Sequence, residues 1–241
     1  MINAFYKKYQ KHFDVSENNF AHFVMWSCGG ICIGFVIGLV GIAFHLALEW
    51  ATEFRTAHPM LLWLLPFGGL AIVLAYRLAG QEKDRGTNFI LVAVRANEAV
   101  TLRTAPLIFF STVVTHLLGG SAGREGAALQ LGGSIASSFG RMFQLNEREG
   151  RIMTMCGMAA GFAALFGTPL TSVIFAMEVI TVGVMHYSAI VPCIISALVA
   201  AGLSQAVGIA PTTFSIAHIP AAVGLENCFR AAVLGVLCAI L

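Results

Sequence analysis

Charge is the scarcest property of this 241-residue chain. Only 11% of its residues are charged, 14 Lys and Arg against 12 Asp and Glu, whereas soluble globular proteins carry about 25%. Hydrophobic residues make up 58% of the sequence, and the mean hydropathy is +0.82. So few charges cannot cover a surface in water, nor form a basic face broad enough to bind nucleic acid. The composition predicts a bilayer-embedded protein and disfavours aqueous enzymes and nucleic-acid-binding modules.

Metal-binding and catalytic patterns are also missing. None of the six cysteines forms a CxxC pair or lies beside histidines at zinc-finger spacing. Cys28 and Cys32 lie one helical turn apart, as small residues lining a helix face do. His45 and Glu49 share that spacing without a third ligand, so we expect an interfacial hydrogen-bonded pair. With no Ser/His/Asp arrangement at workable spacing, we expect no metal, no other cofactor and no enzyme activity.

The chain opens with a polar segment that is followed by two long apolar runs. Residues 1–20 are polar and basic, and the apolar run over residues 21–50 exceeds the ~20 residues that span a bilayer. This run lacks the short apolar core and small-residue cleavage site of a signal peptide, so it predicts an uncleaved spanning helix. A second span is expected over residues 59–79. The positive charges of residues 1–20 and 77–103 predict that both segments lie in the cytoplasm.

The remaining apolar segments are mostly short and are separated by glycine-rich breaks rather than by polar loops. Interrupted segments of this kind are typical of helices that do not cross the whole membrane. Because lipid cannot satisfy free backbone groups, their ends must lie inside the protein, where they can bind ions. Charged residues over positions 141–151 are expected to form a solvated loop between helices. The apolar segments are residues 105–118, 125–139, 152–166, 169–184, 188–207 and 229–241.

The last residues of the chain are entirely apolar or glycine. Residues 231–241 read AAVLGVLCAIL, and at ~1.5 Å per residue they cover about half of a ~30 Å hydrocarbon core. A natural terminus would hardly end midway through a membrane helix. We therefore expect the sequence to be a fragment or one part of a split protein.

The segment with the densest chemical signal is residues 119–133, GGSAGREGAALQLGG. A glycine-rich turn runs into a helix, and Glu125 lies in the first turn of that helix. Free N–H groups and the dipole at a helix start attract an anion, either a mobile ion or a side-chain carboxylate. A protonated Glu125 would lose that attraction and swing away, which would link anion movement to proton movement. The alternative is a helix-capping acid paired with Arg124 or another basic group.

Two motifs give the chain a resemblance to the CLC anion channels and transporters. Residues 123–126 (Gly-Arg-Glu-Gly), followed by Gln130 and two glycines, are similar to the family's gating-glutamate motif. Residues 161–170 (GFAALFGTPL) and 174–178 (IFAME) resemble the paired helices that follow the gate. The resemblance implies an all-α, polytopic fold of two inverted halves, in homodimers whose subunits each have a pore. It implies that residues 21–241 form the first half and the start of the second.

Three departures from the common chloride pattern resemble the family's bacterial fluoride/proton antiporter branch. The loop that is usually Gly-Ser-Gly-Ile-Pro reads GTNFI here, Ala127 replaces a proline, and Val179 replaces an internal proton-transfer glutamate. The resemblance implies that Glu125 is the gating and proton-coupling residue, and Glu178 has a proton-handling or structural role. The implied anion-binding residues are Gly86, Thr87, Asn88, Phe89, Gly123, Arg124 and Gly126.

The expected function is therefore fluoride export driven by proton entry, by a multi-pass, homodimeric protein of the bacterial inner membrane with a cytoplasmic N-terminus. Its partners would be fluoride or chloride, protons and the lipid bilayer. A chloride/proton exchanger or a chloride channel of the same family is the nearest alternative. A membrane enzyme that uses Glu125 and a histidine as acid and base, or a non-transporting structural fragment, are alternatives from other classes.

Overall fold

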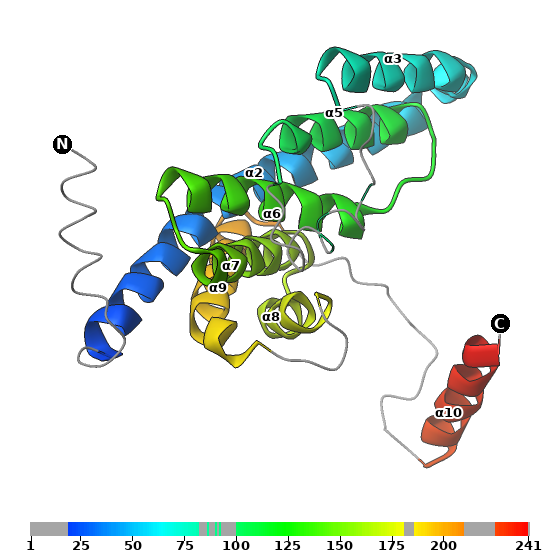
Figure 1. Ribbon diagram of the computed structural model, residues 1–241. Coiled ribbons are helices and arrows are strands. Elements are labelled where there is room, and N and C mark those ends of the chain that lie inside the picture. The colour runs from blue at the N-terminus through cyan, green and yellow to red at the C-terminus, as the bar shows by residue number, and fades with distance from the viewer. Residues whose placement is uncertain are drawn as a thin grey trace. The chain divides into compact units, whose positions relative to one another are not determined.

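The computed structural model describes residues 19–81, 86, 90, 92, 100–180, 186–209 and 225–240. Within these residues the chain is helical and contains no strand, which confirms the expected all-α class (Figure 1). The elements are α2 (Asn19–Ala57), η1 (Pro59–Leu64), α3 (Leu65–Leu78), α5 (Thr104–Leu117), α6 (Arg124–Met142), α7 (Glu147–Phe166), α8 (Pro169–Glu178), η2 (Tyr187–Ala189), α9 (Ile190–Ala206) and α10 (Leu225–Ile240). The described residues from Asn19 to Ile209 belong to one compact unit, and α10 belongs to a second unit.

In the described part of the chain, three helical segments are long and apolar enough to cross a membrane: Phe23–Ala57, Pro59–Leu78 and Tyr187–Ala206. The first ends seven residues beyond the expected run, which was to end at residue 50, because α2 continues to Ala57. The second begins as a 3-10 helix and becomes α-helical at Leu65. The helices Thr104–Leu117 and Pro169–Glu178 are apolar and shorter. The prediction of long spans mixed with short apolar helices is therefore confirmed.

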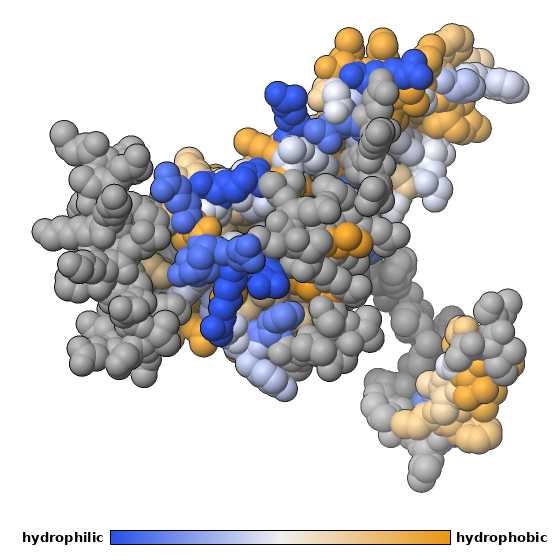
Figure 2. All heavy atoms as spheres, viewed as in Figure 1, coloured by the Kyte–Doolittle hydropathy of each residue, from blue (hydrophilic) through white to orange (hydrophobic). Residues whose placement is uncertain are grey.

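The outer helices present apolar side chains to their surroundings. On α2, Ile31, Phe35 and Leu39 are exposed on one face, while Ile33 and Ile37 are buried on the other. Gly68 is the buried residue of α3, and the rest of that helix is half-buried or exposed. Figure 2 shows apolar side chains gathered over the region of α3. Such a surface suits contact with lipid or with other apolar protein.

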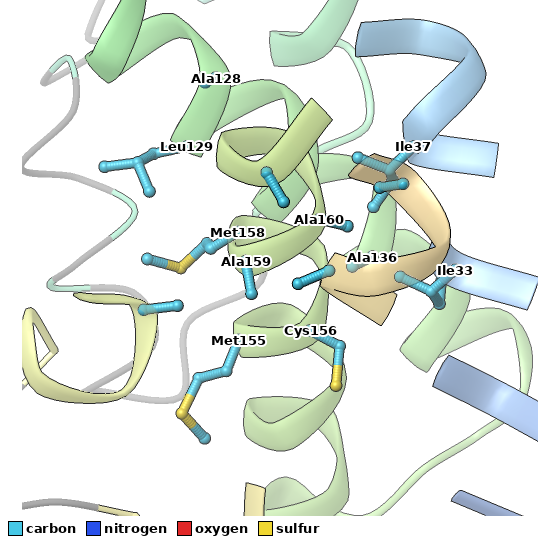
Figure 3. Close-up of a cluster of buried hydrophobic side chains, with 14 of the residues drawn as sticks. Ile33, Ile37, Ala128, Leu129, Ala136, Met155, Cys156, Met158, Ala159 and Ala160 are labelled. Atoms are coloured by element: carbon cyan, nitrogen blue, oxygen red, sulfur yellow. The ribbon is translucent and has the colours of Figure 1, made fainter. Parts of the chain in front are cut away.

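The core of the first unit lies along α6 and α7. Every residue of α6 from Ala127 to Ala136 is buried, and α7 is buried all round from Ile152 to Gly161. Figure 3 shows Ile33 and Ile37 of α2 together with Cys156, Ala159 and other side chains of α7 in this core. Helices that are buried on every side must pack against neighbours all round. Accordingly, α7 contacts α2, α6, α8 and α9.

Glycines allow α6 and α7 to cross in backbone contact. A Cβ on Gly132 would overlap the carbonyl O of Gly157, and one on Gly157 would overlap the carbonyl O of Gly132. One turn further along α7, a Cβ on Gly161 would lie 2.7 Å from the carbonyl O of Ala128. Small residues at such crossings bring helix backbones together in membrane proteins. The crossing fixes the position of α6 relative to the core.

Glycines also allow α2 and α9 to pack in backbone contact. Three glycines on α2, spaced four residues apart, face α9: Gly30, Gly34 and Gly38. A Cβ on Gly34 would lie 2.5 Å from the carbonyl O of Ser196, and one on Gly30 would lie 2.9 Å from that of Pro192. The small-residue spacing therefore brings these two long helices into backbone contact.

Hydroxyl groups join α9 to α7. Ser196 donates its Oγ–H to the carbonyl O of Cys156 at 3.0 Å, and Ser204 donates to that of Ala164 at 2.7 Å. Both bonds are buried, and they are two turns apart on each helix. Serine hydroxyls that cross between helices in this way help to hold membrane bundles together. They fix α7 and α9 in register.

The expected loop over residues 141–151 is wrong. Arg141 lies in the last turn of α6, and Glu147 and Glu149 lie in the first turn of α7. Asn146 accepts a hydrogen bond from the N–H of Glu149 at 3.0 Å, and the Glu149 carboxylate accepts one from the N–H of Asn146 at 3.1 Å. This reciprocal capping starts the helix among the charges, since acidic groups are favourable at a helix N-terminus.

The helix α10 forms part of the second unit. It spans Leu225–Ile240, and an ion pair between Glu226 and Arg230 joins successive turns of it. Its start lies four residues before the predicted segment 229–241. The exposed side chains of this helix include Phe229, Leu234 and Leu237.

The helix crossing makes a stability prediction. Gly132→Ala should lower the stability of the folded protein by about 1–3 kcal/mol, because the new Cβ overlaps backbone that cannot rotate away. The measurement is the midpoint of thermal unfolding in detergent. Gly202→Ala on α9 is the control, since nothing lies within 4 Å of a Cβ there. Equal midpoints for the two variants would contradict the close crossing.

Candidate anion site

The site is built where α5 ends and α6 begins. Gly119 adopts φ +81°, and the N–H groups of Gly119 and Gly120 bond back to the carbonyl O atoms of His116 (3.2 Å) and Thr115 (2.8 Å). This arrangement ends α5 with glycine in the left-handed region, where other residues are strained. The chain can then reverse and start α6 at Arg124.

The start of α6 lacks a side-chain cap. Gly123 is extended (φ −70°, ψ 140°), and it provides no side chain to accept from the first N–H groups of the helix. Glu125 lies in the first turn. Helix N-termini with free N–H groups are anion-binding positions, because the N–H groups and the helix dipole act together. The predicted helix start, with Glu125 in its first turn, is therefore present in the structure.

The carboxylate of Glu125 turns back over the helix start. A Cβ placed on Gly123 would lie only 2.9 Å from Oε2 of Glu125. The Glu125 side chain is exposed, and among the described residues it forms no ion pair with Arg124 or any other base. The alternative interpretation, in which Glu125 is a capping acid paired with Arg124, is therefore not supported by an ion pair among these residues.

A cleft of about 840 Å³ opens beside this helix start, between α3, α5 and α6. It brings together glycines from two sequence motifs that lie apart in the chain: Gly86 from one, and Gly123 and Gly126 from the other. Gly86 has φ +65°, which favours glycine at that position. The other lining residues are Ile72, Val73, Tyr76, Arg77, Gln81, Ile108, Ser111, Thr112, Ala127 and Gln130.

The polar groups of the cleft are of kinds that bind a small anion. Arg77 supplies a positive charge, Thr112 supplies a hydroxyl group from α5, and Gln130 supplies an amide. The hydroxyl of Ser111 also lines the cleft, but it donates to the carbonyl O of Ile108 at 3.2 Å. Arg77 and Gln130 also make other interactions within the protein. Hydroxyl, amide and guanidinium groups all donate hydrogen bonds, and bonds to an ion are the stronger ones. Glu125 is not among the lining residues.

Sequence reasoning missed part of this lining. It took Arg77 only as a charge that marks the cytoplasmic side, and it did not single out Ser111 or Thr112. The available signal was two adjacent hydroxyl residues in the middle of an apolar helix, where polar groups need partners. Nothing in the sequence placed that helix face against residues 123–130.

Other predicted residues lie elsewhere. Thr87, Asn88 and Phe89 are outside the described residues. Arg124 is half-buried, does not line the cleft, and is close enough to His45 to act on it electrostatically. Glu178 is the exposed last residue of α8 and also does not line the cleft.

His45 and Glu49 face each other along α2. Their Nε2 and Oε2 atoms are 4.0 Å apart, within ion-pair range but longer than a hydrogen bond. The expected hydrogen-bonded pair is therefore a looser contact. Nδ1 of His45 is buried and has no hydrogen-bond partner among the described residues. Those residues also include no group of three or more side chains placed to hold a metal ion.

The fold and the cleft together define a class: a helical membrane protein in which short helices end at a polar cleft. A solved structure with this architecture is the crystal structure of a CLC-type fluoride/proton antiporter. The match has a TM-score of 0.81 at 30% identity and covers 92% of this chain and 56% of that one. A slow cyanobacterial Cl⁻/H⁺ antiporter matches in fold, with a TM-score of 0.68 at 21% identity over 88% of this chain and 53% of that one.

The family is shown by sequence. Residues 67–241 match the family described as voltage gated chloride channel, and the chain belongs to that family. A chloride/fluoride channel protein of Pseudomonas syringae pv. tomato is 40% identical over 188 residues, which are 78% of this chain and 42% of that protein. The H(+)/Cl(−) exchange transporter ClcA of Cronobacter sakazakii is 34% identical over 60% of this chain and 34% of its own length.

These matches confirm the predicted resemblance to the CLC family. The relatives are named as channel proteins or exchange transporters. The chain spans about half or less of the length of the curated relatives described here, 42% of one and 34% of the other. The anion that the whole protein transports is therefore proposed below.

The cleft predicts a role for Arg77 in anion binding. Arg77→Gln should weaken fluoride or chloride binding by the whole protein about tenfold or more, because a hydrogen bond to a charged group contributes ~1.5–3 kcal/mol. The measurement is titration calorimetry in detergent. Arg141→Gln is the matched control, since that guanidinium bonds Ser137 (3.2 Å) and Ser138 (2.9 Å) in the last turns of α6. Equal affinities for the two variants would exclude Arg77 from the site.

Proposed function

We propose that the protein is a membrane anion transporter and that this chain forms one wall of its anion pathway. The observation that supports this most is the cleft that joins Gly86, Gly123 and Gly126 at the uncapped start of α6. A helix start is an anion site without any metal or cofactor, because its N–H groups carry the positive end of the dipole. Family membership adds support, since the relatives are named for chloride and fluoride.

Fluoride is the anion we propose. It is small and strongly hydrated, so a site must replace its water with several close donors. The hydroxyl of Thr112, the guanidinium of Arg77 and the backbone N–H groups at the start of α6 are donors of that type. The likeness to a fluoride/proton antiporter structure at 30% identity and the Pseudomonas relative support the same choice.

The gate in this proposal is Glu125. Its carboxylate lies over Gly123, at the helix start where an anion would bind, so carboxylate and anion compete for one positive region. Protonation removes the charge of the carboxylate and its attraction to the helix start. The anion then replaces it. Alternating between these two states links the passage of an anion to the passage of a proton.

Proton coupling in this proposal rests on Glu125 alone. Val179 follows the exposed Glu178 at the end of α8, and a valine cannot titrate. Glu178 does not line the cleft, so we propose no direct contact between it and the anion. The proton therefore moves with Glu125 between outward-facing and inward-facing positions.

A chloride/proton exchanger is the second candidate function. It is favoured by the 34% identity to an H(+)/Cl(−) exchange transporter of Cronobacter sakazakii. Both candidates place the protein in the bacterial plasma membrane, with residues 1–20 in the cytoplasm, and in both we propose a homodimer. The two candidate functions differ in the size of the anion that the hydrogen-bond donors of the cleft would surround.

Anion flux separates the two candidates. The whole protein in liposomes should carry fluoride faster than chloride and move protons in the opposite direction. The measurements are electrode recordings of fluoride, chloride and pH. Equal rates of chloride and fluoride transport would exclude the assignment to fluoride and favour the chloride/proton exchanger.

The gating role makes a prediction for Glu125. Glu125→Gln should reduce proton movement to the background of empty liposomes, because a glutamine cannot carry the proton. Glu178→Gln is the matched control and should keep coupling, since Glu178 is the exposed last residue of α8 and does not lie at the start of α6. If Glu125→Gln still coupled fluoride to protons, the proposed gate would be wrong.

The contact over Gly123 makes a finer prediction. Gly123→Ala leaves the backbone unstrained, since φ −70° and ψ 140° suit alanine, but its Cβ would displace the Glu125 carboxylate. The ratio of protons to fluoride moved should fall. Gly150→Ala is the control, because nothing lies within 4 Å of a Cβ there. An unchanged ratio in Gly123→Ala would mean that this carboxylate position plays no part in coupling.

A further inference from the structure

Two cysteines from different helices contact each other inside the core. Sγ of Cys193 on α9 donates a weak hydrogen bond to Sγ of Cys156 on α7, and the sulfurs are 3.7 Å apart. The side chains are 0% and 1% exposed. Figure 3 shows the sulfur of Cys156 projecting from α7 in this core. The four other cysteines are exposed: Cys28, Cys32, Cys228 and Cys238.

The surrounding backbone holds the sulfurs in place. Ser196 shares its hydroxyl between the carbonyl O of Cys156 and that of Cys193, both at 3.0 Å. Two turns away, Ser204 bonds the carbonyl O of Ala164. Because these bonds keep α7 and α9 in register, the two thiols remain neighbours rather than meeting by chance.

We propose that Cys156 and Cys193 are a covalent modification site, which an uncharged two-electron oxidant closes to a disulfide joining α7 and α9. The S–S bond of a disulfide is about 2.05 Å long, so the sulfurs must approach by roughly 1.7 Å from their present separation. In this proposal the two side chains rotate and the helices shift slightly to allow that approach.

The reaction balances with an azo oxidant such as diamide. The sulfur of one thiol bonds to one nitrogen of the N=N group, and its hydrogen passes to the other nitrogen. The second thiol then attacks the first sulfur, the S–N bond breaks, and the S–S bond forms. The oxidant leaves as a hydrazine that has taken both hydrogens and two electrons. Because neither thiol reaches water, charged thiol reagents should fail and even diamide should react slowly.

Formation of the disulfide should shift the position of α6. Gly157 follows Cys156 directly, and its backbone lies against that of Gly132 with no side chain between them. Well-packed interiors transmit strain instead of absorbing it. A shift of α7 at Cys156 therefore moves α6, whose first turn contains Glu125. This second step rests on the proposed transport function.

The site is tested by counting thiols. In the whole protein with every cysteine except Cys156 and Cys193 replaced by serine, titration in denaturant should find two thiols before diamide treatment and none after it. A charged methanethiosulfonate, applied to the folded protein, should leave both thiols free. Two thiols remaining after diamide would overturn the proposal, as would rapid reaction of the pair with the charged reagent.

The effect on α6 is tested by transport in the same background. Diamide should lower anion flux about threefold or more, within the range of coupling between packed sites, and dithiothreitol should restore it. Cys193→Ala should keep its flux under diamide, because it cannot form the bond. If the oxidised protein transports as fast as the reduced one, the link to α6 is wrong. If the reduced protein transports neither fluoride nor chloride, the proposed function fails, and the thiol count still decides the disulfide.

Discussion

The backbone contact between Gly132 and Gly157 is the constraint on which the candidate site depends. It places α6 against α7 without an intervening side chain, and α7 is in turn held by α2 and by the serines of α9. A helix fixed in this way has a first turn in a defined position. The N–H groups at the start of α6 can then serve one wall of the cleft, because they are part of a rigid element and not of a mobile loop.

The apolar setting gives the few polar groups of the cleft their importance. In water a helix start, a hydroxyl and an arginine would each bind solvent, and none would select an ion. Apolar residues such as Ile72, Val73 and Ile108 line the cleft beside these groups, and in the proposed function the groups donate hydrogen bonds to an anion there. In the proposed function the carboxylate of Glu125, which lies over Gly123, competes with that anion for the start of α6, and this would make the site sensitive to protons without a second titrating group.

Much of the fold could be predicted from the sequence, because membrane helices are marked by long apolar runs and by glycine breaks. The start of α6 and the place of Glu125 in its first turn followed from a glycine-rich turn beside a carboxylate. The prediction of a loop over residues 141–151 was wrong, since a cluster of charges marks a helix cap as readily as a loop. The lining by Arg77, Ser111 and Thr112 could not be predicted, because it depends on how α3 and α5 pack against α6.

The central claim is that a small anion binds to backbone N–H groups at the start of α6. Solid-state NMR can test it directly, by recoupling bound ¹⁹F-fluoride to ¹⁵N of glycine in the whole protein reconstituted in lipid. The account predicts dephasing of the Gly126 amide nitrogen, within hydrogen-bond distance of fluoride, and none at Gly150. Fluoride that dephases no glycine nitrogen near the start of α6, in a sample that still transports fluoride, would contradict it.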